Sequence, residues 1–233
     1  MKASRRFRSA AQMVDRSKTY TIDEAVDLLQ KLPRAKFDET VEVAIQLGVD
    51  VRKSDQMVRG TVALPHGTGK KVRVVAICQG DQAREAETAG AEQVGFTDIV
   101  EKIQGGWLDF DVIVAAPDTM REVGKLGKLL GPRGLMPSPK TGTVTANVGQ
   151  AVREVKAGKI EFKTDKSGNL HVPIGKASFE ADKLKANGTA AFDAVLKAKP
   201  SSSRGEYLRS ATLSSTMGPG IRLDIKAIAA QGA

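Results

Sequence analysis

The chain has 233 residues, more than the usual single domain, so one large or two modest domains are expected. Hydrophobic residues make up 41% of it and aromatic residues only 4%, which predicts aliphatic cores and disfavours nucleic-acid binding by extensive aromatic stacking. The single cysteine, Cys78, excludes an internal disulfide and a cysteine-rich metal site. No apolar run is long enough to span a bilayer and no signal peptide is evident, so a soluble, cytoplasmic protein without membrane contact is expected.

The net charge of +9 is concentrated at the two ends of the chain. Residues 67–158 carry 12 basic and 11 acidic side chains, whereas residues 1–66 and 159–233 together carry 24 and 16. One electropositive body built from both ends, with a nearly neutral insertion, is typical of a nucleic-acid-binding domain that carries a second domain. The basic start of the chain favours an arm that touches nucleic acid. A generally basic solvated surface is the alternative.

The first flank predicts one helix and two strands. A helix is expected over Thr21–Leu32, which opens with the spacing of a capping box. Thr40–Gly48 alternates apolar and polar residues, which predicts a strand with one buried and one polar face. Gly60–Leu64 predicts a second strand, and the Pro- and Gly-containing run after it predicts a crossing into another domain.

The middle of the chain has a different pattern of apolar residues. Val72–Cys78 and Asp111–Ala116 are nearly continuous apolar runs, which predict strands buried on both faces. Asp81–Ala89 and Asp98–Ile103 predict short helices, and a longer helix is expected over residues 117–130. Strands alternating with helices in this way indicate a parallel, Rossmann-like three-layer α/β sheet.

A loop of unusual composition follows at Gly131–Gly142 (GPRGLMPSPKTG). Glycine permits backbone angles that side chains forbid and proline fixes φ, so three of each in twelve residues specify one rigid shape. Arg133 and Lys140 on this loop suit a phosphate-bearing partner.

The last flank returns to the alternating pattern of the first. Lys159–Lys163 and Leu170–Ile174 predict two strands, joined as a hairpin by the turn Asp165–Asn169. Ser178 is expected to cap a helix that ends near Lys197.

Leu208–Leu213 and Ile221–Ile225 predict the final strands. Together the flanks indicate an open-faced α+β sandwich into which the middle is inserted.

The sequence motifs of nucleotide-binding enzymes are absent or incomplete in this chain. Gly69–Lys71 has the Gly-Lys pair of a P-loop, but Leu64 stands where the first glycine belongs and a lysine replaces the magnesium-binding hydroxyl. His66 and His171 are too few for a zinc cluster. No catalytic residue, metal or cofactor is therefore expected, and an enzyme that binds a nucleotide through the middle domain is the alternative.

Six runs carry a resemblance to a known family. In chain order they are Lys36–Glu42, Arg59–Val62, Leu64–Gly67, Val123–Thr145, Gly175–Phe179 and Thr216–Pro219. In type and order they resemble the family of the first large-subunit ribosomal protein, ribosomal protein L-one. The resemblance extends from about Tyr20 to Leu223.

The resemblance implies both a fold and a function. It implies a discontinuous domain with a split β-α-β, ferredoxin-like sheet, residues 1–67 plus 159–233, and an inserted Rossmann-like three-layer α/β domain, residues 68–158. The first domain would bind large-subunit rRNA at the mobile stalk, and the protein would assist release of deacylated tRNA from the exit site. It would also repress translation of its own mRNA, and a dedicated messenger repressor without a ribosomal role is a narrower alternative. A monomer when free, acting in the cytoplasmic ribosome and catalysing nothing, is expected.

The family's RNA-facing positions carry over to nine residues of this chain: Lys36, Phe37, Thr40, Glu42, Lys166, Ser210, Thr216, Met217 and Gly218. The lysines would meet phosphates, and Glu42 would accept a hydrogen bond from a base amine or a ribose 2′-hydroxyl. Phe37 and Met217 would offer apolar surface, and Gly218 would allow two backbones to approach closely. A core position for Phe37 and a merely solvated strand face for Thr40 are the structural alternatives. The loop cations Arg133 and Lys140 would meet tRNA or other RNA transiently.

Overall fold

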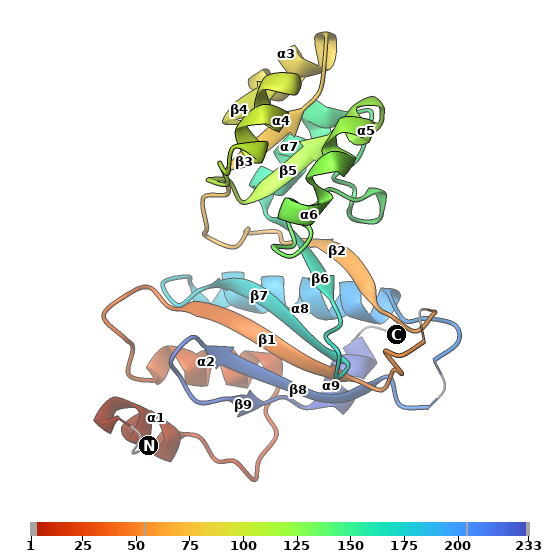
Figure 1. Ribbon diagram of the computed structural model, residues 1–233. Helices are drawn as coiled ribbons and strands as arrows, with labels where there is room; N and C mark the ends of the chain where they lie inside the picture. The colour runs from red at the N-terminus through yellow and green to blue at the C-terminus, as the bar shows by residue number, and fades with distance from the viewer. Residues whose placement is uncertain (1–3, 54, 204, 232–233) are drawn as a thin grey trace. The chain divides into compact units, whose positions relative to one another are not determined.

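The computed structural model describes residues 4–53, 55–203 and 205–231. These residues form a mixed α/β structure with three sheets (Figure 1). The chain divides into two compact units, of which the first runs to Gly69 and resumes at Ile160, and the second is Lys70–Lys159.

The elements follow one another along the chain in this order: α1 (Arg5–Met13), α2 (Ile22–Lys31), β1 (Thr40–Leu47), β2 (Arg59–Ala63), β3 (Val74–Ile77), α3 (Asp81–Thr88), β4 (Gln93–Gly95), α4 (Thr97–Gln104), β5 (Val112–Ala115), α5 (Met120–Val123), α6 (Gly127–Leu130), α7 (Val148–Ala157), β6 (Lys159–Lys163), β7 (Asn169–Lys176), α8 (Ala181–Lys197), β8 (Leu208–Ser215), β9 (Ile221–Arg222) and α9 (Ile225–Gln231).

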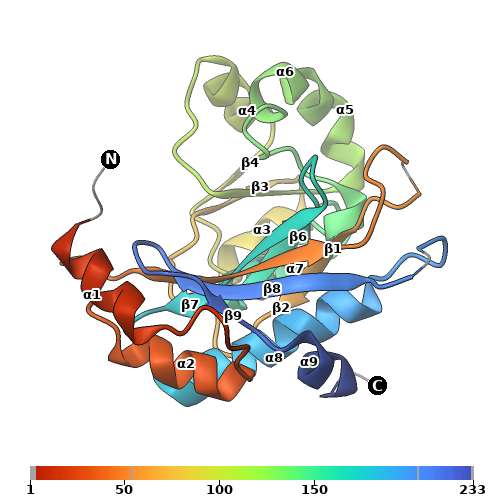
Figure 2. The same ribbon diagram turned by 90° about the horizontal axis from the view of Figure 1, so that it is seen from below.

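The first unit is built on a four-stranded antiparallel sheet with the strand order β7-β1-β8-β9. Every second residue of β1, from Val41 to Leu47, is buried, so the alternation read from the sequence gives the sheet one apolar face. Figure 2 shows α2 and α8 lying along that face. Their apolar side chains, including Leu29 and Phe192, join the same core.

The predicted capping box of α2 is present. The Thr21 hydroxyl accepts a hydrogen bond from the Glu24 amide, and the Glu24 carboxylate accepts one from the Thr21 amide. Both bonds satisfy amides that have no partner inside the helix, an arrangement that stabilises a helix by about 1 kcal/mol.

The predicted hairpin between the strands at 159–163 and 170–174 is wrong. The turn itself forms, since the Asp165 carboxylate accepts hydrogen bonds from the Ser167 and Asn169 amides, each at 2.8 Å. The flanking strands nevertheless join different sheets, because β6 pairs with β2 and β7 pairs with β1. Gly60 on β2 explains the choice for β6: a Cβ there would lie 2.7 Å from the ring of Phe162, so only glycine leaves room for this buried side chain.

The predicted cap of the long helix is also wrong. Helix α8 begins at Ala181 after Glu180, and Ser178 instead donates its amide and its hydroxyl to the Asp38 carboxylate. Ser178 thus fastens the end of β7 to the segment before β1. A serine three residues before the helix has no amide of the first turn within reach, and the long-range carboxylate takes its place.

The last predicted strand is shorter than expected. Strand β9 covers only Ile221–Arg222, and helix α9 follows from Ile225. The Asp224 carboxylate accepts hydrogen bonds from the Lys226 and Ala227 amides, which is the behaviour of an N-cap residue and explains why the chain turns into a helix there.

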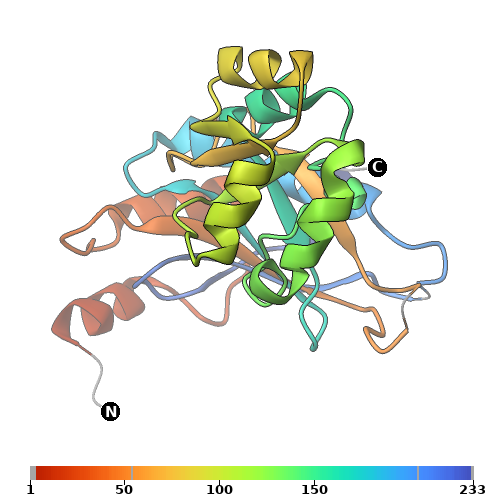
Figure 3. The same ribbon diagram turned by 45° about the horizontal axis from the view of Figure 1, so that its top comes forward.

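The second unit contains a three-stranded parallel sheet in the order β4-β3-β5. Alternate residues of β3 enter two cores: Val75 and Ile77 pack with α4 and α6 residues, whereas Val74 and Ala76 pack with α3 and α7 residues. Helices thus cover both faces of the sheet, as Figure 3 shows. Strand β4 and helix α7 were not predicted.

The single helix expected over residues 117–130 is broken in the structure. It consists of the short helices α5 and α6, with 3₁₀ turns at Pro117–Thr119 and Gly124–Leu126. Glycines at 124 and 127 weaken a regular helix, and the buried Thr119 hydroxyl donates to backbone oxygens of Ile77 and Ala116. The apolar side chains at 123, 126 and 130 still face the core as predicted.

Candidate nucleic-acid interface

Polar side chains line the face of the four-stranded sheet opposite α2 and α8. On β1 the outward positions start at Thr40 and Glu42, and the register places Glu42 opposite Ser214 on β8. Gln46, further along, lies opposite Ser210. Because these side chains carry hydroxyl, carboxylate and amide groups, a polynucleotide can meet hydrogen-bond donors and acceptors along this face.

A buried carboxylate organises the Thr40 end of this face. Glu39 is only 1% exposed, and its Oε1 accepts the Ala35 amide at 2.6 Å. Its Oε2 accepts the Ser215 hydroxyl at 2.7 Å and the Met217 amide at 3.0 Å. One side chain therefore joins the loop before β1 to the turn after β8, and these two segments hold five of the predicted contact residues.

Helix α1 is attached to the same carboxylate through Arg6. Its guanidinium lies 3.5 Å from Glu39 Oε1 and donates to the backbone oxygens of Pro33 and Met217 at 3.1 and 3.0 Å. The basic start of the chain is thus in part a helix that braces the two loops, a role that the sequence did not suggest.

The ionisation of Glu39 depends on these partners. Burial alone would raise the pKa of the carboxyl, but the hydrogen bonds from Ser215, Ala35 and Met217, together with the charge of Arg6, outweigh it and hold the pKa below its ordinary value. The carboxylate is therefore charged at neutral pH, when its hydrogen bonds are strongest.

The loops held by Glu39 expose two large apolar side chains. Phe37 is 54% exposed and Met217 is 51% exposed. The core alternative for Phe37 is therefore wrong, because more than half of the residue is exposed in the segment between the buried Leu32 and Glu39. Lys36 beside it is exposed as well. Two apolar side chains and a cation at the end of a polar face can meet ribose or base surface and phosphate at once.

Thr40 and Thr216 bond to each other as well as facing outward. The Thr216 hydroxyl accepts the Thr40 amide at 2.9 Å and donates to the Thr40 carbonyl oxygen at 3.2 Å, while Lys176 donates to the Thr40 hydroxyl at 2.9 Å. The Thr216 hydroxyl already has two backbone partners. Its main effect on a ligand would then be to fix the turn that presents Met217.

The lack of a side chain at Gly218 leaves room for the Ser215 hydroxyl. A Cβ at this position would lie 2.5 Å from the hydroxyl oxygen of Ser215, the group that donates to Glu39. A side chain at 218 would therefore push away one of the donors that position the carboxylate.

Two of the predicted contact residues lie toward the other end of the sheet. Ser210 donates to Gln46, and Lys166 lies in the turn whose Gly168 carbonyl oxygen bonds the Leu47 amide. Each residue advances a strand by about 3.4 Å, so this end lies roughly 20 Å along β1 from Thr40. The structure thus separates the predicted residues into two groups. The distal pair is Lys166 and Ser210. The main cluster, at the Thr40 end, consists of the other seven: Lys36, Phe37, Thr40, Glu42, Thr216, Met217 and Gly218.

The Gly131–Gly142 loop belongs to the second unit. Hydrogen bonds among Ser138, Thr141 and Thr143 hold its second half, and Gly134 and Gly142 adopt positive φ, which explains why glycine occupies these positions. Arg133 and Lys140 are exposed on it.

Three features of the described residues bear on the enzyme alternative. No three His, Cys, Asp or Glu side chains among them gather as metal ligands would. Cys78 is buried, and burial is the main cause that raises the pKa of its thiol, with Glu87 adding to it, so a nucleophilic thiolate is disfavoured. Helix α3, which follows the central strand, begins with Asp81, whose charge would repel a phosphate there. In the part of the chain that the structure describes, no helix combines the length and apolar character needed to cross a membrane.

Comparison with known proteins agrees with the resemblance read from the sequence. The model of the ribosomal protein L1p/L10e family matches residues 29–219, which include the main cluster and the distal pair. The chain is also 58% identical over 223 residues to the large ribosomal subunit protein uL1 of Saccharopolyspora erythraea, an alignment that covers 96% of this chain and 94% of that protein. The predicted family is confirmed: the chain belongs to the ribosomal protein L1p/L10e family.

Proposed function

We propose that this protein is a structural component of the large ribosomal subunit and binds rRNA of the mobile stalk through its first unit. The observation that carries the proposal is the main cluster, in which Glu39 holds the exposed Phe37 and Met217 at the end of the open sheet face. RNA would be recognised by shape, by phosphate contacts of lysines such as Lys36, and by a few contacts to bases or 2′-hydroxyls.

The charge distribution also favours the first unit as the part that binds RNA. The charge excess lies in the flanks that make up the first unit, whereas the second unit is nearly neutral. Affinity for RNA comes largely from cations, so the first unit is the better candidate for the anchoring surface.

We infer the finer fold from the topology of each unit. The antiparallel sheet with α2 and α8 on one face supports a discontinuous split β-α-β, ferredoxin-like domain, residues 1–67 plus 159–233. The parallel sheet covered on both faces supports a Rossmann-like inserted domain, residues 68–158. These boundaries differ from those of the two compact units by one or two residues.

Further roles follow from the family and are part of the proposal. The loop with Arg133 and Lys140 would contact deacylated tRNA at the exit site and assist its release, and the main cluster would also bind a similar structure in the protein's own mRNA and repress its translation. The free protein would be a cytoplasmic monomer that requires no cofactor.

A filter-binding titration tests the proposal. The full chain should bind a large-subunit rRNA stalk fragment, and its log Kd should rise linearly with log salt concentration because cations displace counterions from phosphates. Phe37→Ala should weaken binding, whereas Arg133→Ala should leave the affinity for this fragment unchanged. A protein that does not bind the fragment, or whose affinity responds only to Arg133→Ala, would refute the assignment of the anchor to the first unit.

A further inference from the structure

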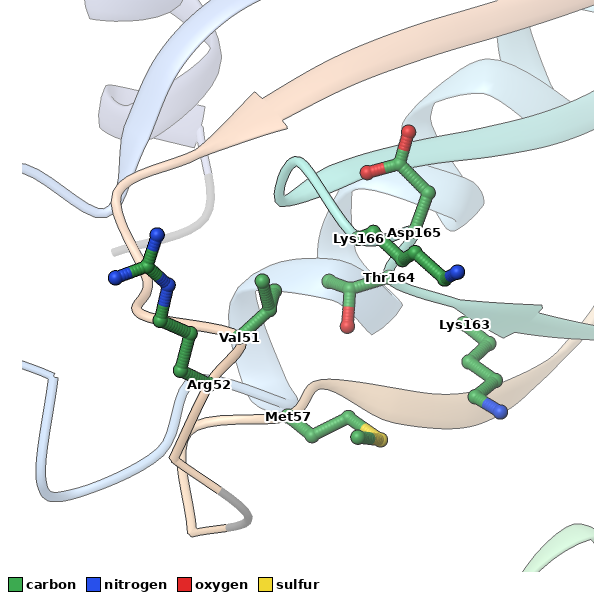
Figure 4. Close-up of a pocket in the computed structure, with 7 residues that line it drawn as sticks. All are labelled: Val51, Arg52, Met57, Lys163, Thr164, Asp165 and Lys166. Atoms are coloured by element: carbon green, nitrogen blue, oxygen red, sulfur yellow. The ribbon is translucent and has the colours of Figure 1, made fainter.

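A pocket of about 530 Å³ opens in the first unit at the end of the sheet that carries the distal pair. Its lining comes from the loop after β1, from the end of β6 and from the segment between β6 and β7 (Figure 4): Val51, Arg52, Met57, Lys163, Thr164, Asp165 and Lys166. A volume of this size lies within the range of small-molecule sites.

Three cations surround this pocket without a partner among the described residues. The side chains of Arg52, Lys163 and Lys166 make no hydrogen bond or ion pair to the parts of the chain that the structure covers. Figure 4 shows Arg52 on one side of the pocket and the two lysines on the other. Unpaired cations on opposite sides of one depression repel each other and favour an anion between them.

The one acidic lining residue is turned away from the pocket. The Asp165 carboxylate accepts hydrogen bonds from the amide and side chain of Asn169 and from the Ser167 amide, which lower the pKa of the carboxyl and keep it in the turn. In Figure 4 it points away from Met57 and Val51. The ligand therefore meets a positive rim with little opposing charge.

The interior of the pocket is apolar and its walls are fixed. Met57 is 43% exposed and lies with Val51 between Arg52 and Lys163 in Figure 4, and the Thr164 hydroxyl donates to the Val58 carbonyl oxygen. Gln56 holds the loop by accepting the Asp50 amide at 2.8 Å. An exposed methionine beside unpaired cations suits a ligand with one flat apolar part and one anionic part.

We propose that this pocket receives one unpaired nucleotide of the bound RNA, with its phosphate at Lys163, Lys166 and Arg52 and its base against Met57. A duplex backbone presents phosphates and sugars on a convex surface and brings no base face into such a depression, whereas an unstacked nucleotide does. The inference rests on the proposed function and adds a second contact, with a stated kind of RNA feature, at the distal end of the sheet.

The test compares full-length variants for binding to the rRNA stalk fragment over a range of salt concentrations. Lys163→Ala should weaken binding and reduce the salt slope by about 0.7, the value for one phosphate contact on a single strand. Met57→Ala should weaken binding about three- to tenfold without changing the slope, because it removes apolar contact and no charge. Met57→Leu should retain the affinity. Lys197→Ala, which removes an exposed lysine of α8 on the other side of the sheet, is the matched control and should bind like the wild type.

Acylation of ribose 2′-hydroxyls locates the nucleotide. One unpaired position of the fragment should change reactivity when wild-type protein binds and should lose that change with Met57→Ala. If Met57→Ala binds like the wild type, the site is a phosphate contact only and the nucleotide assignment is overturned. If Lys163→Ala and Met57→Ala both behave like Lys197→Ala while the wild type binds tightly, the pocket takes no RNA although the proposed function stands. Saturable binding of AMP alone, with no altered position in the RNA, would overturn the RNA assignment in favour of a free nucleotide.

Discussion

Replacing Glu39 with glutamine tests the node that positions the main cluster, because the change keeps the shape of the side chain and removes its charge. The carboxylate accepts three hydrogen bonds, from Ala35, Ser215 and Met217, and only 1% of the residue is exposed. An amide has one accepting oxygen, so its nitrogen must face at least one of these donors. A buried donor without a partner costs about 1–3 kcal/mol. The remaining bonds also lose the assistance of a charge, roughly 0.5–1 kcal/mol each.

The expected loss of stability is therefore about 2–5 kcal/mol for the first unit. Urea unfolding of the full chain can assign it to that unit, because Trp107, the only tryptophan, lies in the second unit, whereas far-UV circular dichroism reports on both. Glu39→Gln should shift the circular-dichroism transition and leave the Trp107 fluorescence transition in place. Glu42→Gln, at a partly exposed position three residues later, is the control and should change stability by less than about 0.5 kcal/mol.

The destabilisation caused by Glu39→Gln should depend on pH in a direction that follows from the pKa shift of Glu39. The pKa of Glu39 is lowered in the folded protein, so its carboxylate stabilises the fold above its ordinary pKa of 4.5, and this contribution is lost as the pH falls through the lower folded value. The difference between wild type and Glu39→Gln should shrink below about pH 4.5. Equal unfolding midpoints at pH 7, or a difference that grows in acid, would refute the account of Glu39 as a charged node.

Three further predictions follow from other contacts. Asp111→Asn should destabilise the second unit by about 2 kcal/mol at neutral pH, since hydrogen bonds from Lys70 and Arg73 lower the pKa of Asp111 to about 2. Urea unfolding followed by Trp107 fluorescence should show this difference from wild type vanishing as the pH falls from 3.8 toward 2. An unchanged unfolding midpoint at pH 7 would contradict the prediction. Met217→Ala should weaken binding of the rRNA fragment by about 1–3 kcal/mol in a filter assay and leave the unfolding midpoint unchanged, because the side chain is half exposed. A variant that binds the fragment as tightly as the wild type would remove Met217 from the interface. Gly218→Ala should lower RNA affinity and reduce stability by about 1–3 kcal/mol, because its Cβ would lie 2.5 Å from the Ser215 hydroxyl. Gly124→Ala, whose Cβ meets nothing within 4 Å, is the control. A Gly218→Ala protein as stable as Gly124→Ala would show that the Ser215 contact is unimportant.

The candidate site was only partly predictable from the sequence. Motif resemblance named Phe37, Met217 and Gly218, but nothing local indicated that Glu39 would be buried between their segments, because the donors of its three bonds come from positions 35, 215 and 217. A single acidic residue before a strand looks like an ordinary surface residue. The bracing role of Arg6 was missed for the same reason, since its partners at Pro33 and Met217 lie far along the chain.

The sequence by itself determined the local secondary structure of the protein. The alternation along β1, the capping box of α2 and the apolar runs of β3 and β5 each depend on neighbouring residues, and the structure has each of them within two residues of the predicted position. The charge counts and the family motifs are likewise properties of the linear chain.

The tertiary structure decided which elements meet. The turn at Asp165–Asn169 has the composition of a hairpin, yet β6 pairs with β2 because Gly60 makes room for Phe162, and β7 pairs with β1. The Glu39 node and the cationic pocket around Met57 likewise bring together residues more than a hundred positions apart. Such pairings depend on complementary volume and charge in three dimensions, which local periodicity does not encode.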